Sequence, residues 1–252
     1  MFIDTHCHLT DEYDVSIDVI VNRANIAGVG ALICATAEPK DIKSAIQIAQ
    51  THKNIFVTTG IYPDYINSNP SDYLCEDILN NPLVVGVGEI GLDYHYSPQT
   101  RMQQIELFEQ QLEIAQKYDL PVAIHTRDAE QDTANILTDK NKGVMHCFTS
   151  GWDLAKVMLD RGFYFSASGI LTFKNADDIR ETFAKIPIDR IVIETDSPYC
   201  APVPYRGQRC EPAFVIETAK VLAQIKNLQI KDLETILFEN TKRLYPKCHV
   251  KL

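Results

Sequence analysis

Short apolar runs alternate along the chain with longer stretches in which apolar residues recur at helical spacing. The apolar runs are rich in β-branched residues, which is typical of buried strands. They cover residues 2–4, 31–36, 55–61, 83–89, 122–125, 144–148, 163–168 and 191–195. Helices are expected over 15–27, 40–51, 71–80, 99–118, 128–139, 152–160, 176–185, 212–226 and, at the end, 230–245.

This alternation predicts an α/β fold of parallel strands joined by helical crossovers. Eight such units in about 250 residues fit a (β/α)8 TIM barrel, here with an extra C-terminal helix. A doubly wound open sheet is the alternative, since the pattern does not give the strand order. No repeat, low-complexity segment or linker-like composition interrupts the chain, so residues 1–252 are expected to form a single domain.

The stretch PLVVGVGEIGLDY contains Gly86, Gly88 and Gly91 at the G-x-G-x-x-G spacing of dinucleotide-binding loops. Such a loop needs a helix that begins at the third glycine, so that its N-terminus meets the pyrophosphate. Here the next helix is expected near Gln99, and Glu89 would place a negative charge in the phosphate site. We therefore expect no nucleotide cofactor, and we expect the glycines to allow close packing around Glu89.

Side chains of metal-ligand type lie at or just beyond the C-terminal ends of five of the predicted strands, where TIM barrels carry their chemistry. They are His6 and His8, Glu89, His125, His146 and Asp196. Alternate residues of a strand point to the same side, so His6 and His8 can bind one cation together while Cys7 points away. A lone strand-end histidine is more often a hydrogen-bonded structural residue. Six such residues on one rim favour a metal site.

The ligand set predicts the number of ions better than their identity. Imidazole and carboxylate suit Zn²⁺, Mn²⁺, Fe²⁺ or Ni²⁺, and carboxylates also suit Mg²⁺. Six ligands exceed what one tetrahedral ion needs, whereas two ions about 3.5–4 Å apart, bridged by a carboxylate, would use them all. We therefore expect two divalent ions, with Mg²⁺, Mn²⁺ and Zn²⁺ all candidates.

Neighbouring histidine and cysteine residues are assigned more limited roles. His95 lies in a loop six residues past Glu89 and is expected to support the site indirectly or to face solvent. Cys147 follows His146, so strand alternation predicts that it points to the opposite face as a small buried apolar residue. The chain has 7 Cys and no C-x-x-C, which favours free thiols in a reducing compartment.

Charge and the N-terminal sequence restrict partners and location. The net charge of −10 repels phosphate backbones at long range, so a nucleic-acid partner needs local attraction from a few Arg and Lys or from bound metal ions. The N-terminus MFIDTHCHLT has neither the basic nor the apolar region of a signal peptide. No apolar run approaches ~18 residues. A cytoplasmic protein without a membrane partner is expected.

The chain resembles, end to end, the TatD family of metal-dependent deoxyribonucleases within the amidohydrolase-like hydrolases. The resemblance lies in DTHCH (4–8), GEIGLDY (88–94), HTRDA (125–129), MHCF (145–148), ETDSPY (194–199) and RGQRCEP (206–212). It implies a TIM barrel in which His6, His8, Glu89 and Asp196 hold one metal ion and Glu89, His125 and His146 hold the other. It also implies hydrolysis of DNA phosphodiesters, often from the 3′ end, although some members of the wider group act on other esters, including aminoacyl-tRNA.

Two positions depart from the usual pattern of that family. After the third strand the family commonly has Gly-x-His-Pro, whereas this chain has Tyr62 before Pro63. A histidine that could contact phosphate or a leaving group is therefore missing, which bears on nuclease rate and specificity. The family tail usually reads Arg-Asn-Glu-Pro, and here Cys210 precedes Glu211. The N-terminal H-x-H, which some members lack, is intact.

The predicted reaction is a 3′–5′ exonuclease-like cleavage of DNA, preferably of single strands or ends, by a metal-activated water. Glu89 would bridge the ions, and Asp196 would orient the water and accept its proton. Because no side-chain nucleophile is needed, no covalent intermediate is expected.

Substrate contacts are expected from two arginines and three aromatic rings. Arg127 and Arg206 could each hold a phosphate with two hydrogen bonds, although Arg127 could instead pair with Asp128 or Glu194. The rings that could stack on bases, or could simply pack, are Tyr62, Tyr94 and Phe148.

Two other functions remain open on the same residues. The first is hydrolysis of another ester or amide, such as an aminoacyl-tRNA ester, a lactone or a small amide. Many such enzymes carry a carboxylated lysine at strand four, where this chain has Glu89, which favours the nuclease branch. The second is a non-catalytic, metal-stabilised scaffold, which the open coordination positions of a six-ligand, two-ion site argue against. The sequence leaves the oligomeric state open, and a monomer is compatible with it.

Overall fold

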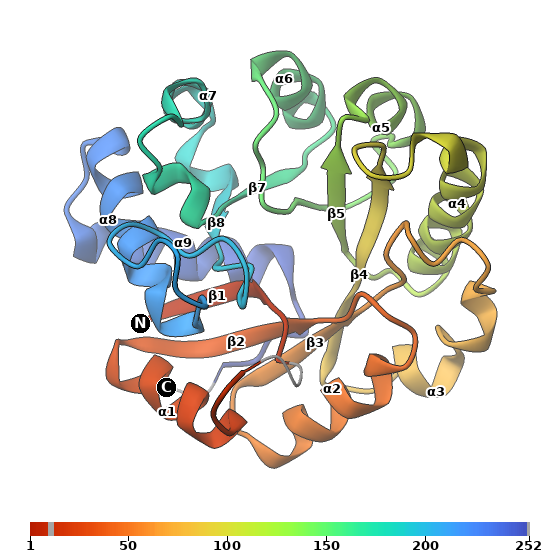
Figure 1. Cartoon of the computed structure of the whole chain (residues 1–252), viewed down its shortest axis with the longest axis horizontal. Helices are drawn as coiled ribbons and strands as arrows, with labels where there is room; N and C mark the ends of the chain where they lie inside the picture. The colour runs from red at the N-terminus through yellow and green to blue at the C-terminus, as the bar shows by residue number, and fades with distance from the viewer. Residues whose placement is uncertain (10–12, 251–252) are drawn as a thin grey trace.

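The computed structural model describes residues 1–9 and 13–250. In that part of the chain, eight parallel strands pair in the sequential order β1 to β8, and a bridge between Cys7 and Ser197 joins the end of the last strand to the first. Figure 1 shows the helices arranged around the outside of these strands. The predicted (β/α)8 TIM barrel is confirmed, and the open-sheet alternative is wrong.

The elements closely follow the predicted alternation. The strands are β1 (Phe2–Cys7), β2 (Val29–Ala35), β3 (Ile55–Thr59), β4 (Val84–Asp93), β5 (Val122–Arg127), β6 (Gly143–Met145), β7 (Tyr164–Ala167) and β8 (Ile191–Ile193). The helices are α1 (Ile17–Ile26), α2 (Asp41–Thr51), α3 (Glu76–Leu79), α4 (Arg101–Lys117), α5 (Glu130–Ile136), α6 (Trp152–Asp160), α7 (Asp177–Lys185), α8 (Val215–Lys226) and the extra C-terminal helix α9 (Ile230–Leu244). The helix expected over 71–80 is instead a 3-10 turn, Pro70–Asp72, followed by the short α3.

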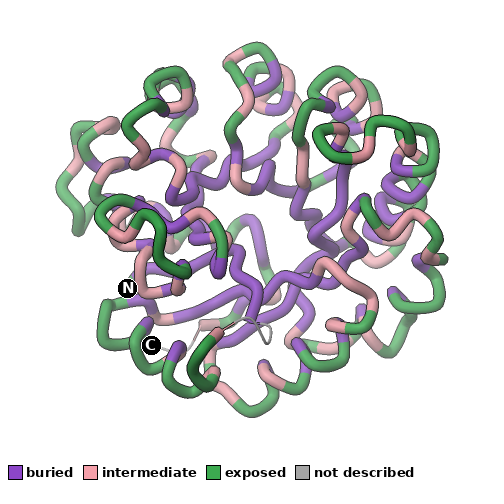
Figure 2. Tube along the Cα trace, in the orientation of Figure 1, coloured by how far each residue is buried: buried purple, intermediate pink, exposed green. Residues whose placement is uncertain are grey.

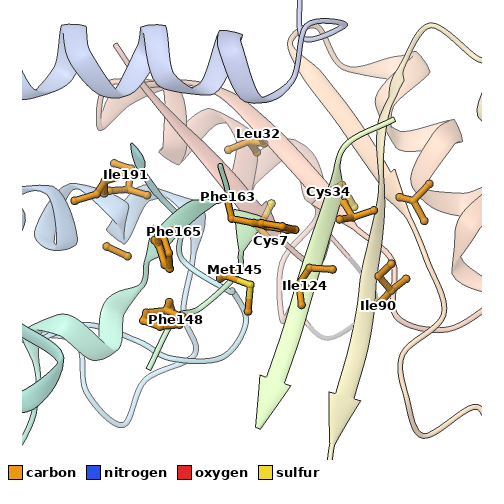
Figure 3. Packing of buried hydrophobic residues seen from close by; sticks show 14 of the residues in the cluster. Cys7, Leu32, Cys34, Ile90, Ile124, Met145, Phe148, Phe163, Phe165 and Ile191 are labelled. Atoms are coloured by element: carbon orange, nitrogen blue, oxygen red, sulfur yellow. The ribbon is translucent and has the colours of Figure 1, made fainter. Parts of the chain in front are cut away.

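Strand alternation divides the buried hydrophobic side chains into two clusters. In β2, Leu32 and Cys34 belong to the larger cluster, which lies between the strands and the helices, whereas Ala31 and Ile33 belong to the interior cluster. Figure 3 shows part of the larger cluster, with Leu32 and Cys34 among its labelled side chains. Figure 2 shows that the strands are buried and that the surrounding helices are exposed on their outer sides.

The interior cluster fills the N-terminal half of the barrel and leaves the other half to polar residues. It draws on early strand positions, such as Ile3 and Val85, and on Leu244 and Tyr245 at the end of α9. The C-terminal helix therefore helps to close one end of the barrel. Polar side chains such as His6 and Glu89 are buried farther along the same strands, at the end where TIM barrels bind their ligands.

The glycines of β4 allow its neighbours to approach closely. Gly91 has a φ of 145°, and a Cβ there would lie 2.0 Å from the carbonyl oxygen of His125 on β5. A Cβ on Gly88 would lie 2.6 Å from the Cβ of Ala123. The expectation of close packing around Glu89 is thus confirmed. The helix that follows is α4, which begins at Arg101 and not at the third glycine.

None of the helices in the described part of the chain has the length and apolar character needed to cross a lipid bilayer.

Candidate metal centre

Glu89 lies in the middle of a buried polar cluster at the C-terminal rim of the barrel. Its Oε1 is 2.9 Å from His125 Nδ1 and 3.0 Å from His146 Nε2. Its Oε2 is 3.4 Å from His6 Nε2 and 3.6 Å from His8 Nε2. The two carboxylate oxygens therefore face two different pairs of histidines, which is the arrangement of a carboxylate able to bridge two ions.

Asp196 adds a second carboxylate on the side of His6 and His8. Its Oδ1 is 3.5 Å from His8 Nε2 and 3.9 Å from His6 Nε2. Its backbone N–H donates to the carbonyl oxygen of His6 at 2.9 Å, which fixes the turn after β8 against β1. The structure thus brings all six predicted ligand residues together. Ligand atoms of three subsets lie within 4.8 Å of one another: His6, His8 and Glu89; Glu89, His125 and His146; His6, His146 and Asp196.

The surroundings of His6 indicate whether the cluster is suited to bind a cation. Its ring is buried and stacks on His146 with the centroids 4.0 Å apart. Neither ring nitrogen has a hydrogen-bond partner among the described residues. Burial, reinforced by the charge of His146, lowers the pKa of His6, so the ring is neutral with a free lone pair. A buried, unpaired polar group is costly, and a bound cation would satisfy it.

The carboxylate of Glu89 and the imidazole of His146 stabilise each other's charged form. Burial disfavours the charged form of Glu89, but His146, His125 and His6 outweigh it and hold the pKa of Glu89 well below its ordinary value. Burial likewise disfavours charge on His146, yet Glu89 and Glu194 raise the pKa of His146 well above its usual range. In this arrangement protons on the histidines neutralise the carboxylates, and divalent cations could take their place.

Two buried carboxylates outside the predicted ligand set orient the histidines. Asp93 Oδ2, at the end of β4, lies 3.0 Å from His125 Nε2. Glu194 Oε1, just past β8, lies 3.1 Å from His146 Nδ1 and accepts the backbone N–H of Cys147 at 2.7 Å. Such partners fix the tautomer and direction of metal-binding imidazoles. The sequence analysis missed both roles, although both carboxylates lie in the motifs quoted above.

A cavity of about 770 Å³ opens above the cluster. Its floor includes five of the six predicted ligand residues: His8, Glu89, His125, His146 and Asp196. Four tyrosines line its walls: Tyr62, Tyr65, Tyr96 and Tyr199. Three carboxylates, Glu38, Asp41 and Asp64, also line it, and among the described lining residues Arg127 is the only Arg or Lys.

Arg127 lines the cavity, but it does not form the ion pair with Asp128 or Glu194 that the sequence analysis gave as an alternative. Its guanidinium lies over the ring of Tyr96, 4.8 Å from the centroid. Asp128 instead contacts His95 Nδ1 at 2.8 Å, and Glu194 is held by the groups described above. Pairing of Arg127 with Asp128 or Glu194 is therefore wrong. The half-exposed His95 ring agrees with the expectation that this residue faces solvent.

Of the other residues predicted to contact substrate, one lines the cavity and the rest pack or hydrogen-bond within the protein. Arg206 stacks on Phe173 at 3.7 Å and is not among the described residues that line the cavity. Of the three rings, Tyr62 lines the cavity. Tyr94 donates its hydroxyl hydrogen to a carboxylate of α5, and Phe148 is buried in the larger core cluster.

The prediction that Cys147 points away from His146 is wrong. β6 ends at Met145, so strand alternation no longer applies two residues later. Cys147 has a φ of 41°, and its side chain lines the same cavity as His146. All seven cysteines are free thiols, as expected.

The comparisons with known proteins agree with this fold and cluster. The family model for TatD related DNase matches residues 3–246. This chain belongs to the TatD-related DNase family. The metal-dependent hydrolase YabD of Bacillus subtilis is 34% identical over 252 residues, which cover 97% of this chain and 99% of YabD. The metal-dependent hydrolase YcfH of Escherichia coli K12 is 35% identical over 263 residues, covering 96% and 95% of the two chains.

Solved structures of TatD relatives have the same architecture. YjjV, a TatD homologue from Escherichia coli K12, superimposes with a TM-score of 0.89 at 28% identity and covers 97% of this chain and 98% of its own. A TatD family hydrolase from Entamoeba histolytica superimposes with a TM-score of 0.83 at 26% identity and covers 97% of each chain.

The two residues that depart from the usual TatD pattern, Tyr62 and Cys210, both form hydrogen bonds near the metal centre. The Tyr62 hydroxyl donates to Asp93 Oδ2 at 2.7 Å and lies 3.2 Å from His125 Nε2. Tyr62 thus supports the carboxylate that orients His125. Cys210 is buried, and its backbone N–H donates to the carbonyl oxygen of Pro198 at 3.0 Å. The TatD-type tail loop is therefore anchored close to the turn that carries Asp196.

Proposed function

We propose that this chain is a divalent-metal-dependent hydrolase that cleaves phosphodiester bonds of DNA, in a 3′–5′ exonuclease-like manner on single strands or ends. The proposal rests on one observation: a buried Glu89 with two histidines facing each of its oxygens, one of them the unpaired His6. The relatives named metal-dependent hydrolases and the DNase family support it. Residues 1–252 act as a single barrel domain in this proposal.

The six ligand-type residues divide into two sets that share Glu89. One ion, Mg²⁺, Mn²⁺ or Zn²⁺, would be held by His6, His8, Glu89 and Asp196, and the second by Glu89, His125 and His146. When bound, such ions supply Lewis acidity, which acidifies water and neutralises charge on phosphate oxygens. The buried, prearranged carboxylates and imidazoles provide the geometry that this chemistry requires.

Asp196 orients the attacking water and accepts its proton. Burial disfavours its charged form, but the hydrogen bond from His8 and the positive charge of His146 lower the pKa of Asp196. The carboxylate is therefore ionised at neutral pH and can act as the base. It lies on the cavity floor, where water and substrate both have access.

The cavity wall offers one contact for phosphate and several for bases. Arg127 would bind a phosphate, with the Tyr96 ring holding its guanidinium in place. Tyr96 and Tyr199 are 69% and 52% exposed, and both residues line the cavity. Exposed aromatic rings of this kind stack on unpaired bases without sequence preference. This suits single strands and ends better than an internal duplex.

The acidic part of the cavity wall favours a second candidate function. Glu38, Asp41 and Asp64 face the same space as Arg127. Carboxylates attract an ammonium group and repel additional phosphates. An aminoacyl ester carries such an ammonium beside its scissile bond. We therefore propose hydrolysis of an aminoacyl-type ester or amide as the alternative on the same centre.

One experiment separates the two substrates and tests the centre. Metal-stripped protein is mixed with end-labelled single-stranded DNA and, in parallel, with an aminoacyl-RNA ester, and Mg²⁺, Mn²⁺ or Zn²⁺ is then added. Asp196→Asn tests the centre, and His52→Ala, a surface histidine that contacts Asp18, is the matched control. DNA cleavage that a metal restores, that Asp196→Asn loses and that His52→Ala keeps supports the nuclease. Ester hydrolysis without DNA cleavage moves the proposal to the alternative. Failure of every metal on both substrates contradicts both.

A further inference from the structure

Two cysteine thiols and a carboxylate meet beside the metal centre, on the side of Asp196 away from the histidines. The ligand atoms of Cys147, Asp196 and Cys200 all lie within 4.8 Å of one another. The three residues line the same open cavity. They come from the turn after β6 and the loop after β8, so the barrel brings together two thiols that are 53 positions apart in the sequence (200 − 147).

The two oxygens of Asp196 face different partners. Oδ1 faces His8 and His6 at the distances given above, whereas Oδ2 lies 3.5 Å from Cys200 Sγ. A carboxylate with its oxygens divided in this way can bind one cation on each side. Asp196 therefore belongs both to a nitrogen-and-oxygen set and to a sulfur-and-oxygen set.

The backbone is unusual at all three positions. Cys147, Asp196 and Cys200 have φ values of 41°, 58° and 53°. This left-handed region is uncommon for residues other than glycine, and such conformations concentrate at functional sites. Here each one turns a ligand-type side chain toward the same point of the cavity.

We propose that Cys147, Cys200 and Asp196 form a separate binding site for a thiophilic divalent cation such as Zn²⁺ or Cd²⁺, joined to the metal centre through the shared carboxylate. Binding forms two metal–sulfur bonds and one metal–oxygen bond. The two thiol protons leave to the buffer, and water completes a four-coordinate site. The site does not depend on the hydrolase activity proposed above.

The distances allow such an ion with small side-chain movements. Zn–S bonds of about 2.3 Å in a tetrahedral site place two sulfurs about 3.8 Å apart. Atoms that already lie within 4.8 Å reach this spacing by small χ1 rotations. Cys147 Sγ is also 3.1 Å from the buried Ser168 hydroxyl. That hydroxyl can rotate to donate its hydrogen to a thiolate, as partners of metal-bound sulfur commonly do.

Ligand chemistry makes this site selective. Thiolates prefer Zn²⁺, Cd²⁺ and other soft ions, while Mg²⁺ and Mn²⁺ prefer oxygen ligands. The histidine and carboxylate set on the other side of Asp196 accepts both kinds of ion. Excess Mg²⁺ will therefore leave the thiol site open to a thiophilic ion.

The test is a Cd²⁺ titration of the full chain in excess Mg²⁺ with a phosphine reductant, followed by the ultraviolet charge-transfer absorption of cadmium–thiolate bonds. A thiol count on denatured protein first confirms that all seven cysteines are reduced. We expect wild-type absorption to saturate at the amplitude of one cadmium ion bound to two thiolates. Cys147→Ser and Cys200→Ser should each lose at least half of it, and the double variant should lose all of it. Cadmium at the histidine set gives no such band, so the readout reports the thiol site alone.

The matched control is Cys75→Ser, which removes an exposed thiol at the start of α3 and should leave the titration unchanged. Asp196→Asn should keep the band but weaken Cd²⁺ binding at least tenfold. Melting curves with and without Mg²⁺ establish that each serine variant is folded. Absence of the band in folded wild type, or its persistence in the folded double variant, overturns the proposal.

Discussion

Three histidines of the metal centre are anchored through one ring nitrogen while the other points at Glu89. His8 is anchored on the Ala35 carbonyl oxygen at 3.1 Å, His125 on Asp93 and His146 on Glu194. His6 differs, because it has no such anchor among the described residues and is held by stacking on His146. An imidazole whose direction is fixed binds a metal without losing rotational freedom, so the anchors contribute to affinity although they touch no ion.

Glu194→Gln tests this contribution at the residue scale. The amide keeps the shape of the side chain but has one acceptor oxygen and no charge, and Glu194 Oε1 serves both His146 and the Cys147 N–H. We expect metal affinity to fall about 10–100-fold, measured by competition with a chromophoric chelator. Asp18→Asn is the control, since Asp18 pairs with the surface residue His52. Equal affinity in Glu194→Gln and wild type would show that the anchor contributes nothing.

Ligand residues could be found from the sequence, whereas their anchors could not. The ligands follow directly from strand ends, because every strand end of a barrel reaches the same rim. Glu194 and His146 are 48 positions apart in the sequence. They come into contact only when the barrel places β8 next to β7 and β7 next to β6. Tyr62 could be identified as a departure from the TatD pattern, but its bond to Asp93 depends on three-dimensional packing.

At the scale of elements, apolar periodicity located the strands and helices but not all of their ends. β4 was expected to end at Glu89 and continues to Asp93, where it places the anchor of His125. β6 was expected to reach residue 148 and ends at Met145, which turns Cys147 into the cavity. Strand ends at the rim depend on tertiary hydrogen bonds, such as that from the Cys147 N–H to Glu194. The local pattern of apolar residues does not predict such bonds.

Gly91→Ala tests how β4 and β5 are fitted together. The added Cβ would lie 2.0 Å from the backbone oxygen of His125, at a φ of 145° that alanine rarely adopts. We expect a loss of about 2–5 kcal/mol in the free energy of unfolding, measured by urea denaturation, together with weaker metal binding because His125 is displaced. Gly151→Ala is the control, since a Cβ there meets nothing within 4 Å. Similar losses in the two variants would contradict the close-packing argument.

Asp132 on α5 links three elements and makes part of the stability depend on pH. Its carboxylate accepts two hydrogen bonds of 2.6 Å from Arg101 on α4 and one of 2.7 Å from Tyr94 after β4. The bonds from Arg101, outweighing a smaller effect of burial, and the bond from Tyr94 lower the pKa of Asp132. The folded state therefore binds this proton less readily than the unfolded chain. The stabilisation is complete above the ordinary carboxyl pKa of about 3.9 and is lost as the pH falls through the lower folded value.

Asp132→Asn removes this pH dependence. We expect the variant to be less stable than wild type at pH 7, and we expect the difference to shrink as the pH falls below about 4. Urea unfolding of both proteins across the acid range measures it. A difference that stays constant down to the acid transition, or grows, would contradict the linkage. Asp139→Asn, a change on the loop after α5, controls for the loss of one carboxylate.

For the whole molecule, two features determine how nucleic acid can bind: a net charge of −10, and a cavity in which Arg127 is the only arginine among the described lining residues. The overall field repels a polyanion, so attraction is confined to the metal centre and to Arg127 among the described residues that line the cavity. The barrel keeps this attraction at one rim, with Glu38, Asp41 and Asp64 beside it. A strand end that inserts one or two phosphates fits this distribution of charge better than a long duplex laid across the surface.

The salt dependence of DNA binding tests this reasoning. Each phosphate contact on a single strand contributes a slope of about −0.7 to log K against log salt. One contact through Arg127 therefore predicts that binding of single-stranded DNA weakens by about threefold between 50 and 200 mM salt. Arg127→Ala should bind more weakly and lose most of this dependence. KM measured at several salt concentrations for both proteins provides the comparison. If the affinity for DNA fell about 100-fold or more over this range, some five phosphate contacts would be required. That result would contradict the single contact through Arg127 and would require a row of basic residues leading to the cavity.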